Sequence, residues 1–237
     1  MKEPTFYYER KYWKLGYEYV AGVDEVGRGC FAGPVVAAAV VFRKGETLRN
    51  QGFSLINDSK KLTKLQREIA EKWIKENALT WGIGEISVAL INKLGMGKAT
   101  SAAFRRAIKA ANSKFQMPNV KIDFLLIDAF YIPYLDGFPK GRNKLKGSKN
   151  PKYKYGSKQL AIIKGDEKSY SIAAASIIAK VYRDNLMMGI SKKNKYKNYG
   201  WESNYGYGTR EHRKAILKYG VTAYHRTQFV QTYLNHQ

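Results

Sequence analysis

The sequence predicts an α/β fold that ends in a helical C-terminal region. Three observations support this prediction. Short β-rich or apolar segments are separated along the chain by longer segments with the periodicity of amphipathic helices. Hydrophobic residues make up 44% of the 237 residues, which is enough for a substantial core. No internal repeat and no Pro-, Gly- or Ser-rich linker divides the chain into separate units.

Five segments are predicted as strands because they are β-rich or continuously apolar and are bounded by turn residues. They are Tyr17–Val23, Val35–Phe42, Leu79–Ser87, Ile122–Ile127 and Leu160–Ile163. We expect the glycine-containing stretch Gly27–Gly33 to turn between the first two strands. The second strand has no polar interruption, which is typical of a strand buried on both faces.

Helical periodicity indicates four further segments, which are Thr63–Glu76, Ser87–Ala111, Ser169–Met188 and Thr209–Tyr219. Thr63 is a candidate N-cap for the first of them. The buried stripe of that helix is expected to consist of Leu65, Ile69, Trp73 and Ile74. Gly95 and Gly97 are expected to interrupt the second helix, and Gly220 is expected to end the last.

The chain is strongly basic, with 42 Lys and Arg, 19 Asp and Glu, and a net charge of +23. Residues 140–158 contain eight Lys or Arg and no acid, and four more lysines lie between Lys192 and Lys197, near Tyr196 and Tyr199. Basic side chains bind phosphates and interleaved aromatic rings stack on bases or sugars, so a nucleic-acid partner is favoured. Either cluster alone is equally compatible with a solvated surface. Binding to a membrane surface is disfavoured, because no basic stretch has an apolar helical face.

Cysteine and histidine content excludes two other classes of protein. The single cysteine, Cys30, excludes a disulfide scaffold and a Cys-based zinc site. The three histidines, His212, His225 and His236, lack zinc-ligand spacing. The N-terminal residues contain no apolar targeting region, and the longest apolar run is too short to span a bilayer. We therefore expect a cytoplasmic protein without a membrane partner, and a monomer, since no coiled-coil heptads are present.

Acidic residues at the ends of strands are the unusual feature of so basic a sequence. Three predicted strands are followed by carboxylates, which are Asp24 and Glu25, Asp128, and Asp166. If these strands share a sheet, the acids meet at one edge, where α/β sheets place their sites. Mutually repelling oxygen ligands suit Mg²⁺ or Mn²⁺, and two such ions can activate water for phosphodiester cleavage. Taken singly, each acid is more simply a turn former or a helix cap; all four, in a chain of charge +23, favour a metal site.

A series of short motifs extends along the chain from about residue 17 to about residue 230. They are Gly22-Val23-Asp24-Glu25-Val26-Gly27-Arg28-Gly29, Ala32–Val40, Asn57–Leu62, Leu126-Ile127-Asp128, Lys164-Gly165-Asp166, Ala173–Val181 with Arg183-Asp184, Gly206–Thr209, Glu211-His212 and His225-Arg226. In this order they closely resemble the motifs of the ribonuclease HII family. Because the series covers nearly the whole chain, the resemblance is far more specific than its first motif alone would be.

The resemblance implies a ribonuclease H-like fold, with a mixed five-stranded sheet flanked by helices and an additional helical C-terminal region. It implies an endoribonuclease that hydrolyses the RNA strand of RNA/DNA hybrids and cuts 5′ of single ribonucleotides in duplex DNA. Two metal ions, Mg²⁺ or Mn²⁺, would act in a reaction that leaves 5′-phosphate and 3′-hydroxyl ends. The acids that are both catalytic and metal-binding correspond to Asp24, Glu25, Asp128 and Asp166. Asp184 competes for the fourth position, but the resemblance places that ligand in the Lys164-Gly165-Asp166 motif.

Substrate contacts are also implied by the resemblance. Backbone groups of the Gly27-Arg28-Gly29 turn are expected to contact the ribose 2′-hydroxyl, since glycine permits a close approach. Tyr207 corresponds to a tyrosine that packs on the sugar at an RNA–DNA junction; without the resemblance it would be taken for a buried core aromatic. Phosphate or strand contacts are expected from Lys60, Lys61, Ser176 and Lys180.

Some features depart from the family pattern. The lysine-rich insertion 140–158 lengthens the segment between Asp128 and Asp166, where it could extend the track of the nucleic acid. Cys30 is expected to be only a small packed side chain, and His225 to be a structural hydrogen-bonding residue.

We divide the chain into a catalytic core, residues 1–190, and a C-terminal region, residues 191–237, that contributes to substrate binding.

Two other functions explain parts of the sequence. An enzyme of the ribonuclease HIII type would cut hybrids but act poorly at single ribonucleotides, and the intact Gly27–Gly29 turn and Tyr207 argue against it. A non-catalytic RNA- or ribosome-binding protein would explain the charge but not four acids at strand ends. Mg²⁺-dependent cleavage of a duplex that contains one ribonucleotide separates these functions from the first.

Overall fold

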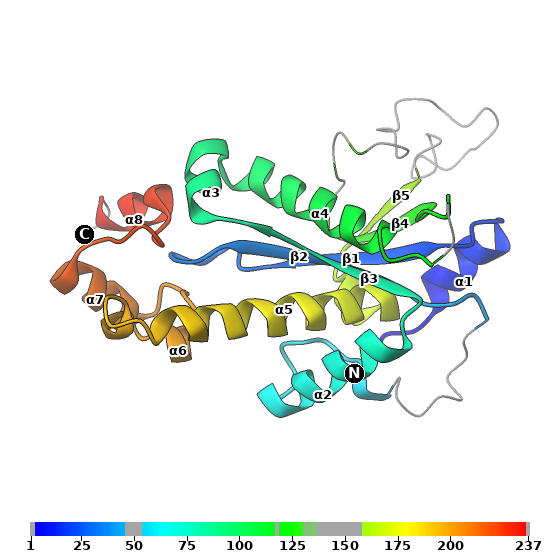
Figure 1. Ribbon diagram of the computed structural model, residues 1–237, viewed down its shortest axis with the longest axis horizontal. Coiled ribbons are helices and arrows are strands. Elements are labelled where there is room, and N and C mark those ends of the chain that lie inside the picture. Colours follow the sequence, from blue (N-terminus) through cyan, green and yellow to red (C-terminus); the bar gives the residue numbers. More distant parts are fainter. Residues whose placement is uncertain are drawn as a thin grey trace.

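A mixed five-stranded sheet forms the centre of the computed structural model, which describes residues 3–45, 54–116, 119–129, 132, 135 and 158–235 (Figure 1). The strands are β1 (Val20–Val26), β2 (Val35–Val41), β3 (Thr80–Ile86), β4 (Phe124–Asp128) and β5 (Gln159–Ile162). Their order across the sheet is β3-β2-β1-β4-β5. The β1 strand pairs antiparallel with β2 and parallel with β4, and β4 pairs parallel with β5. The fold class that the sequence predicted is therefore confirmed.

Eight α-helices surround this sheet in the described part of the chain. They are α1 (Tyr7–Lys14), α2 (Lys64–Asn77), α3 (Val88–Leu94), α4 (Met96–Asn112), α5 (Tyr170–Ser191), α6 (Trp201–Asn204), α7 (Arg210–Tyr219) and α8 (Thr227–Leu234). Two short 3₁₀ helices, η3 (Gly165–Glu167) and η4 (Lys197–Tyr199), flank α5 in the chain. The break between α3 and α4 is at Gly95, one of the two glycines predicted to interrupt this region.

Two hydrophobic cores hold the layers together, one on each face of the sheet. The α4 helix packs against β3 and β2 on one face, and α5 packs against β1 and β2 on the other (Figure 1). All seven residues of β2 are buried, as expected for a strand covered on both faces. The α5 helix is buried along most of its length, so its position relative to the sheet is fixed by packing.

The α2 helix differs in part from the prediction. Thr63 caps it as expected, in a capping box with Gln66. Leu65 and Ile69, which were expected in the buried stripe, are 66% and 48% exposed. The helix packs against α5 and buries Ala70 and Ile74, while Trp73 is partly buried against the core; Leu65 and Ile69 face outward.

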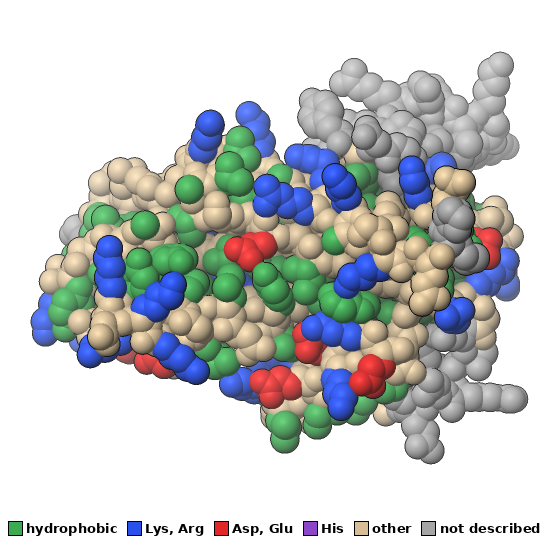
Figure 2. Space-filling view, viewed as in Figure 1, with side chains coloured by type: hydrophobic (Ala, Val, Ile, Leu, Met, Phe, Trp, Pro, Cys, Tyr) green, Lys and Arg blue, Asp and Glu red, His purple; other side chains and the backbone are tan. Residues whose placement is uncertain are grey.

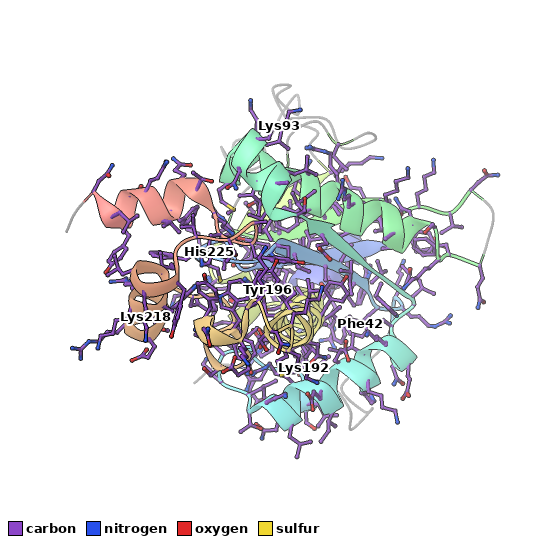
Figure 3. The ribbon with its side chains drawn as sticks, turned by 60° about the vertical axis from the view of Figure 1, so that its left-hand side comes forward. Phe42, Lys93, Lys192, Tyr196, Lys218 and His225 are labelled. Atoms are coloured by element: carbon purple, nitrogen blue, oxygen red, sulfur yellow. The ribbon has the colours of Figure 1, made fainter. Side chains whose placement is uncertain are left out.

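The C-terminal elements form a separate hydrophobic cluster at the end of α5. Trp201 is fully buried at its centre, together with Met187 of α5 and Ala32 of the turn between β1 and β2. Figure 3 shows His225 between the C-terminal helices and the sheet, where it forms an isolated antiparallel bridge with Ala32. This cluster attaches the C-terminal helices directly to the turn that follows β1.

The α1 helix lies outside the segments predicted as helices. It packs onto the sheet through the ring of Tyr12, which is stacked on Phe124 with ring centroids 3.7 Å apart. Residues 140–157 of the predicted lysine-rich insertion lie outside the described residues. Within the described residues, no helix combines the length and the apolar character needed to cross a membrane.

Candidate active site

The predicted acids lie near the C-terminal ends of three parallel strands. Asp24 and Glu25 were expected just after the first strand, but β1 continues through Val26. The reason is that β2 still pairs with β1 at this point, with Asp24 opposite Ala38 and Glu25 opposite Ala37. Asp128 is the last residue of β4, and Asp166 lies in η3, just beyond β5. The three strands therefore bring their acids to the same edge of the sheet.

Asp24 is at the centre of this group. Its side chain is buried, and its Oδ1 accepts a 2.7 Å hydrogen bond from the backbone N–H of Glu25. Burial raises the pKa of Asp24 well above its ordinary value, and the negative charges of Glu25, Asp128 and Asp166 raise it further. A hydrogen bond from Ser176 offsets only part of this effect. The site thus disfavours four ionised acids unless a cation is present.

The two carboxylate oxygens of Glu25 have different surroundings. Arg28 Nη1 lies 3.2 Å from Glu25 Oε1. Glu25 Oε2 is buried and makes no hydrogen bond within the described part of the structure. Burial raises the pKa of Glu25, although the charge of Arg28 lowers it again. A buried carboxylate oxygen without a donor is an open position for a cation.

Asp128 and Asp166 are held by different contacts. Asp128 Oδ1 accepts a 2.7 Å hydrogen bond from the backbone N–H of Gly165, which links β4 to η3. Burial raises the pKa of Asp128, and the charge of Asp166 adds to the increase. Asp166 Oδ2 lies 3.1 Å from the Nζ of Lys60. The backbone of η3 therefore fixes both acids relative to each other.

The competing acid Asp184 lies in a different environment. Its Oδ1 is 3.0 Å from the Nζ of Lys180, one helical turn earlier on α5. Its charge raises the pKa of Tyr207, whereas the charge of Asp166 raises the pKa of Asp24 and of Asp128. These interactions group Asp166, rather than Asp184, with the other three acids.

The donor set of these four acids fits divalent metal ions. All the donors are carboxylate oxygens, which Mg²⁺ and Mn²⁺ prefer, and Glu25 Oε2 is a buried oxygen that has no hydrogen-bond partner among the described residues. Among the described residues, no group of three or more Asp, Glu, His or Cys side chains is placed so that it could hold a metal ion. Mg²⁺ does not need such a group, because it keeps several waters and binds through one or two carboxylates plus substrate phosphates.

The Gly27–Gly29 turn follows the two acids of β1 and lies beside Tyr207. Gly27 has a φ of +88°, and a Cβ there would lie 2.2 Å from Nε of Arg183, so only glycine fits this position. Cys30 is fully buried, as expected, and forms an isolated antiparallel bridge with Tyr207. Tyr207 is 39% exposed, so it is not the buried core aromatic that was the alternative. The backbone bridge thus places the partly exposed Tyr207 next to the residue that follows the turn.

The remaining predicted substrate residues lie around the acids. Ser176 Oγ is 2.9 Å from the Oγ of Ser59, and Lys61 pairs with Asp58 at 3.7 Å. Lys180 Nζ lies 5.6 Å from the ring centroid of Tyr207. The segment that contains Lys60 and Lys61 therefore lies beside the acids. The part of α5 that carries Lys180 lies beside Tyr207.

Two arginines were not predicted as site residues, although both lie in the motifs. Arg183 and Arg226 are fully buried and donate hydrogen bonds to backbone carbonyls of the turn that contains Gly27–Gly29. Their position in Arg183-Asp184 and His225-Arg226 was the available signal. The sequence could not show which backbone groups they contact, because those groups lie far away in the chain.

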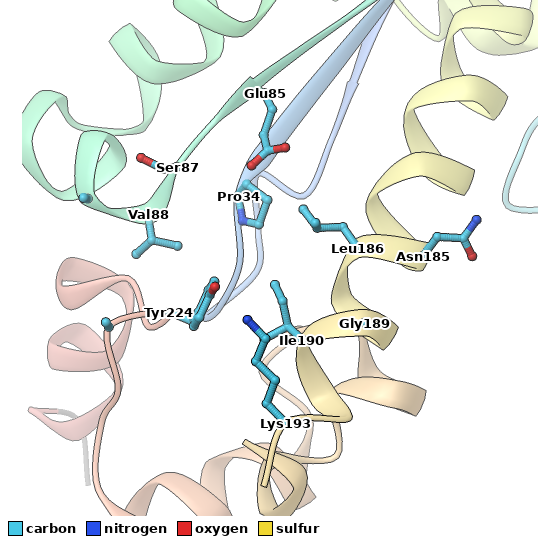
Figure 4. Close-up of a pocket in the computed structure, with 12 residues that line it drawn as sticks. Pro34, Glu85, Ser87, Val88, Asn185, Leu186, Gly189, Ile190, Lys193 and Tyr224 are labelled. Carbon is cyan, nitrogen blue, oxygen red and sulfur yellow. The ribbon is translucent and has the colours of Figure 1, made fainter. Parts of the chain in front are cut away.

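A pocket of about 550 Å³ lies apart from the acids (Figure 4). Pro34, Glu85, Lys193 and Tyr224 are among its lining residues, and none of the predicted site residues lines it.

On the face shown in Figure 2, Lys and Arg side chains are spread over the whole surface, with fewer Asp and Glu side chains between them. Such a surface attracts polyanions over a wide area.

The fold is similar to solved ribonuclease H structures. The ribonuclease H2 of Pyrococcus horikoshii OT3 superposes with a TM-score of 0.64 and 22% sequence identity, over 92% of this chain and 98% of that chain. Bst-RNase HIII in complex with Mn²⁺ superposes with a TM-score of 0.63 and 17% identity, over 94% of this chain and 71% of that chain. The chain therefore has the fold of these ribonucleases H.

Sequence similarity identifies the family within this class. The family model of ribonuclease HII matches residues 21–232. A ribonuclease HII of Clostridioides difficile (strain 630) is 41% identical over 227 residues, which are 96% of this chain and 76% of the relative. The chain belongs to the ribonuclease HII family. It is a hydrolase that cleaves RNA in RNA/DNA hybrids.

Proposed function

We propose that this enzyme cuts the RNA strand of RNA/DNA hybrids and also cuts 5′ of single ribonucleotides in duplex DNA. The observation that carries the proposal is the bridge between Cys30 and Tyr207. It places the turn expected to contact the 2′-hydroxyl next to the ring expected to pack on the sugar. The turn itself begins at Gly27, two residues after Glu25 and three after Asp24.

Asp24, Glu25, Asp128 and Asp166 would hold two Mg²⁺ or Mn²⁺ ions. When bound, the ions supply an activated water and stabilise the charge that develops on the leaving oxygen. Glu25 Oε2 and the mutual repulsion of the acids support this assignment. A protein of this fold, Bst-RNase HIII, has been solved in complex with Mn²⁺, which supports a divalent metal of this kind.

The side chains around the acids orient the substrate. Lys60, Ser176 and Lys180 would contact backbone phosphates, which fix the register of the duplex but carry no sequence information. Backbone carbonyl or N–H groups of the Gly27–Gly29 turn would form a hydrogen bond with the 2′-hydroxyl, the group that distinguishes RNA from DNA. Tyr207 would hold the sugar so that the scissile phosphate lies at the acids. Attack of water on the phosphorus would break the P–O3′ bond, so that the water oxygen stays on the 5′-phosphate and the leaving 3′-oxygen takes up a proton to become the 3′-hydroxyl.

Cleavage of a DNA duplex with one embedded ribonucleotide tests the proposal. We expect Mg²⁺- or Mn²⁺-dependent cleavage at the 5′ side of the ribonucleotide, and no cleavage of the same duplex made only of DNA. Asp128→Asn should abolish the reaction. The 5′ end of the product should be a substrate for 5′-phosphate-dependent ligation. Cleavage of an all-RNA hybrid without cleavage at the single ribonucleotide would instead support activity of the ribonuclease HIII type.

A further inference from the structure

Two arginines, Arg183 and Arg226, are fully buried near the candidate site, and their side chains donate hydrogen bonds to backbone carbonyls. Each has a relative exposure of 0%. Neither pairs with a carboxylate within the part of the chain that the structure describes. Burial of a cation is costly, and it is usually compensated by an acid. Here backbone carbonyls take that role, so the function of these side chains depends on which carbonyls they hold.

Arg183 extends from α5 to two different segments of the chain. Its Nε donates to the carbonyl of Pro34 at 2.9 Å, and its Nη2 donates to the carbonyl of Ala32 at 3.0 Å. Its Nη1 donates to the carbonyl of Tyr205 at 2.8 Å. One planar guanidinium therefore binds the end of the β1–β2 turn and the segment that leads into Tyr207.

Arg226 holds the same turn from the C-terminal region. Its Nη1 donates to the carbonyl of Arg28 at 2.8 Å, in the middle of the Gly27–Gly29 turn. Its Nε and Nη2 both donate to the carbonyl of Gly33, at 3.0 and 2.8 Å, and Nη2 also donates to Pro34 at 3.0 Å. Burial lowers the pKa of Arg226 to about 10, so the side chain still carries its charge at neutral pH.

The backbone of the Tyr207 segment lies directly on the turn. The backbone N–H groups of Phe31 and Ala32 donate to the carbonyl of Gly206, at 2.8 and 3.1 Å. Gly206 has a φ of +84°, and a Cβ there would lie 2.4 Å from the carbonyl oxygen of Ala32. The two segments are thus in direct backbone contact, and the guanidinium groups act on the residues at either side of that contact.

We propose that Arg183 and Arg226 are positioning residues that set the separation between the Gly27–Gly29 turn and Tyr207, and thereby the selectivity for a single ribonucleotide. This inference rests on the proposed function, in which these two elements contact the same nucleotide. Lysine cannot replace arginine here, because one ammonium cannot reproduce the fixed fork of donors that reaches several carbonyls. The arginines touch no substrate themselves and act through the backbone that they hold.

The test compares Arg183→Lys and Arg226→Lys with the wild-type enzyme on two substrates, a single-ribonucleotide duplex and an all-RNA hybrid. Assays are run well below the melting temperature of each variant. We expect kcat at the single ribonucleotide to fall at least about 10-fold more than kcat on the hybrid, because a displacement of roughly 1 Å at a reacting group costs up to about 10²-fold in rate. KM should change little, since the surface lysines still bind the phosphates.

A binding measurement without metal gives a second, independent readout. In EDTA, we expect the wild-type enzyme to bind a duplex with one ribonucleotide more tightly than the same duplex of DNA alone. Either lysine variant should lose this preference and keep its affinity for plain DNA. Arg106→Lys is the matched control, because Arg106 on α4 also donates to a carbonyl, that of Glu85, but contacts neither segment. It should preserve both the rate ratio and the binding preference.

Pro34→Ala keeps the test decisive if a lysine variant does not fold. It preserves the carbonyl that both arginines share but loosens the turn, so the preference for the single ribonucleotide should still fall severalfold. Variants that are less stable but keep both the rate ratio and the binding preference would overturn the inference and leave the arginines purely structural. Failure of the wild-type enzyme itself to cut at a single ribonucleotide would overturn the proposed function instead.

Discussion

Lys60 Nζ lies 3.1 Å from Asp166 Oδ2, although the two residues are 106 positions apart in the chain. The Lys60 side chain is 78% exposed, whereas that of Asp166 is 6% exposed. An exposed ammonium group therefore lies on the solvent side of an acid that we propose as a metal ligand. Because the ammonium can move toward a substrate phosphate, it can leave the carboxylate when a metal and substrate bind.

This arrangement predicts opposite effects of Lys60→Gln on metal and on substrate. Removal of the ammonium charge should lower the Mg²⁺ concentration needed for half-maximal activity severalfold, because a cation competes less with a neutral amide. KM for the nucleic acid should rise, because one phosphate contact is lost. Mg²⁺ titrations at saturating substrate measure the first effect. Lys64→Gln, at an exposed lysine that pairs with Glu68, is the control. An unchanged Mg²⁺ midpoint in Lys60→Gln would show that the ion pair does not compete with the metal.

Asp24→Asn should abolish cleavage and increase the stability of the metal-free protein. Burial and neighbouring acids raise the pKa of Asp24, so the folded state holds its proton more tightly than the unfolded state does. The ionised form thus costs stability as pH rises above the unfolded value, near 3.9. Asparagine removes that cost at neutral pH. Melting temperatures in EDTA at pH 5 and pH 8 measure the effect, which should be larger at pH 8. A variant that is less stable at both pH values would contradict the electrostatic description of the site.

Asp166→Asn and Asp184→Asn separate the two candidates for the fourth acid. Asp166 acts electrostatically on Asp24 and Asp128, whereas Asp184 pairs with Lys180. We expect Asp166→Asn to lower kcat at least about 10³-fold, on the scale of losing a stabilising group in the transition state. Asp184→Asn should lower it far less. Single-turnover rates at saturating Mg²⁺ compare the two, and a greater loss in Asp184→Asn would reverse the assignment.

The sheet and the position of its acids could be predicted because both depend on local patterns. Apolar runs mark β2 and β4, and parallel strands bring Asp24 and Asp128 to one edge. The predicted end of β1 was wrong, because the strand continues for as long as β2 pairs with it. The α1 helix was missed because its charged and aromatic residues show no apolar run, and its burial depends on Phe124, more than a hundred residues away.

The contacts that hold the site together could be predicted far less well. Cys30 and His225 have the packed and hydrogen-bonded roles that the sequence indicated. The roles of Arg183 and Arg226 could not be predicted from their motifs, because each acts through backbone carbonyls. Any residue has such a carbonyl, so the sequence does not mark the partner. Leu65 and Ile69 illustrate the opposite error. Helical periodicity shows that residues share a face, but not how wide a face the neighbouring helix covers.

The buried pair His212 and His225 predicts a loss of stability in acid. Trp201 Nε1–H donates to His212 Nε2 at 3.0 Å, and the Thr222 backbone N–H donates to His225 Nδ1 at 2.8 Å. His225 Nε2 lies 3.2 Å from His212 Nε2, so this network requires both rings to be neutral. The pKa of His225 is lowered to about 4, mainly by burial and to a smaller extent by the charge of His212.

Because the folded pKa of His225 is below its unfolded value, the unfolded state binds more protons between about pH 6.5 and about pH 4. The stability contributed by the neutral ring is complete above this window and is lost as pH falls through it. The difference in unfolding free energy between wild type and His225→Gln should therefore shrink on acidification, by an amount on the order of 2 kcal/mol. Urea unfolding at several pH values measures this difference. A gap that stays constant from pH 7 to pH 4 would show that His225 does not titrate in this way.

Tyr207→Ala should impair cleavage at a single ribonucleotide far more than cleavage of an all-RNA hybrid. The ring is exposed beside the Gly27–Gly29 turn, where it can hold the sugar so that the scissile phosphate meets the acids. Its loss should cost at least about 10²-fold in rate at the single ribonucleotide, the scale expected when a reacting group is displaced by roughly 1 Å. Additional Mg²⁺ should not restore the rate, because the ring contacts no metal ligand. Tyr207→Phe keeps the ring and should retain most of the activity. Tyr219→Ala, at a tyrosine of similar exposure on α7, should leave both substrates unaffected. Equal and small losses on both substrates in Tyr207→Ala would show that the junction is recognised elsewhere.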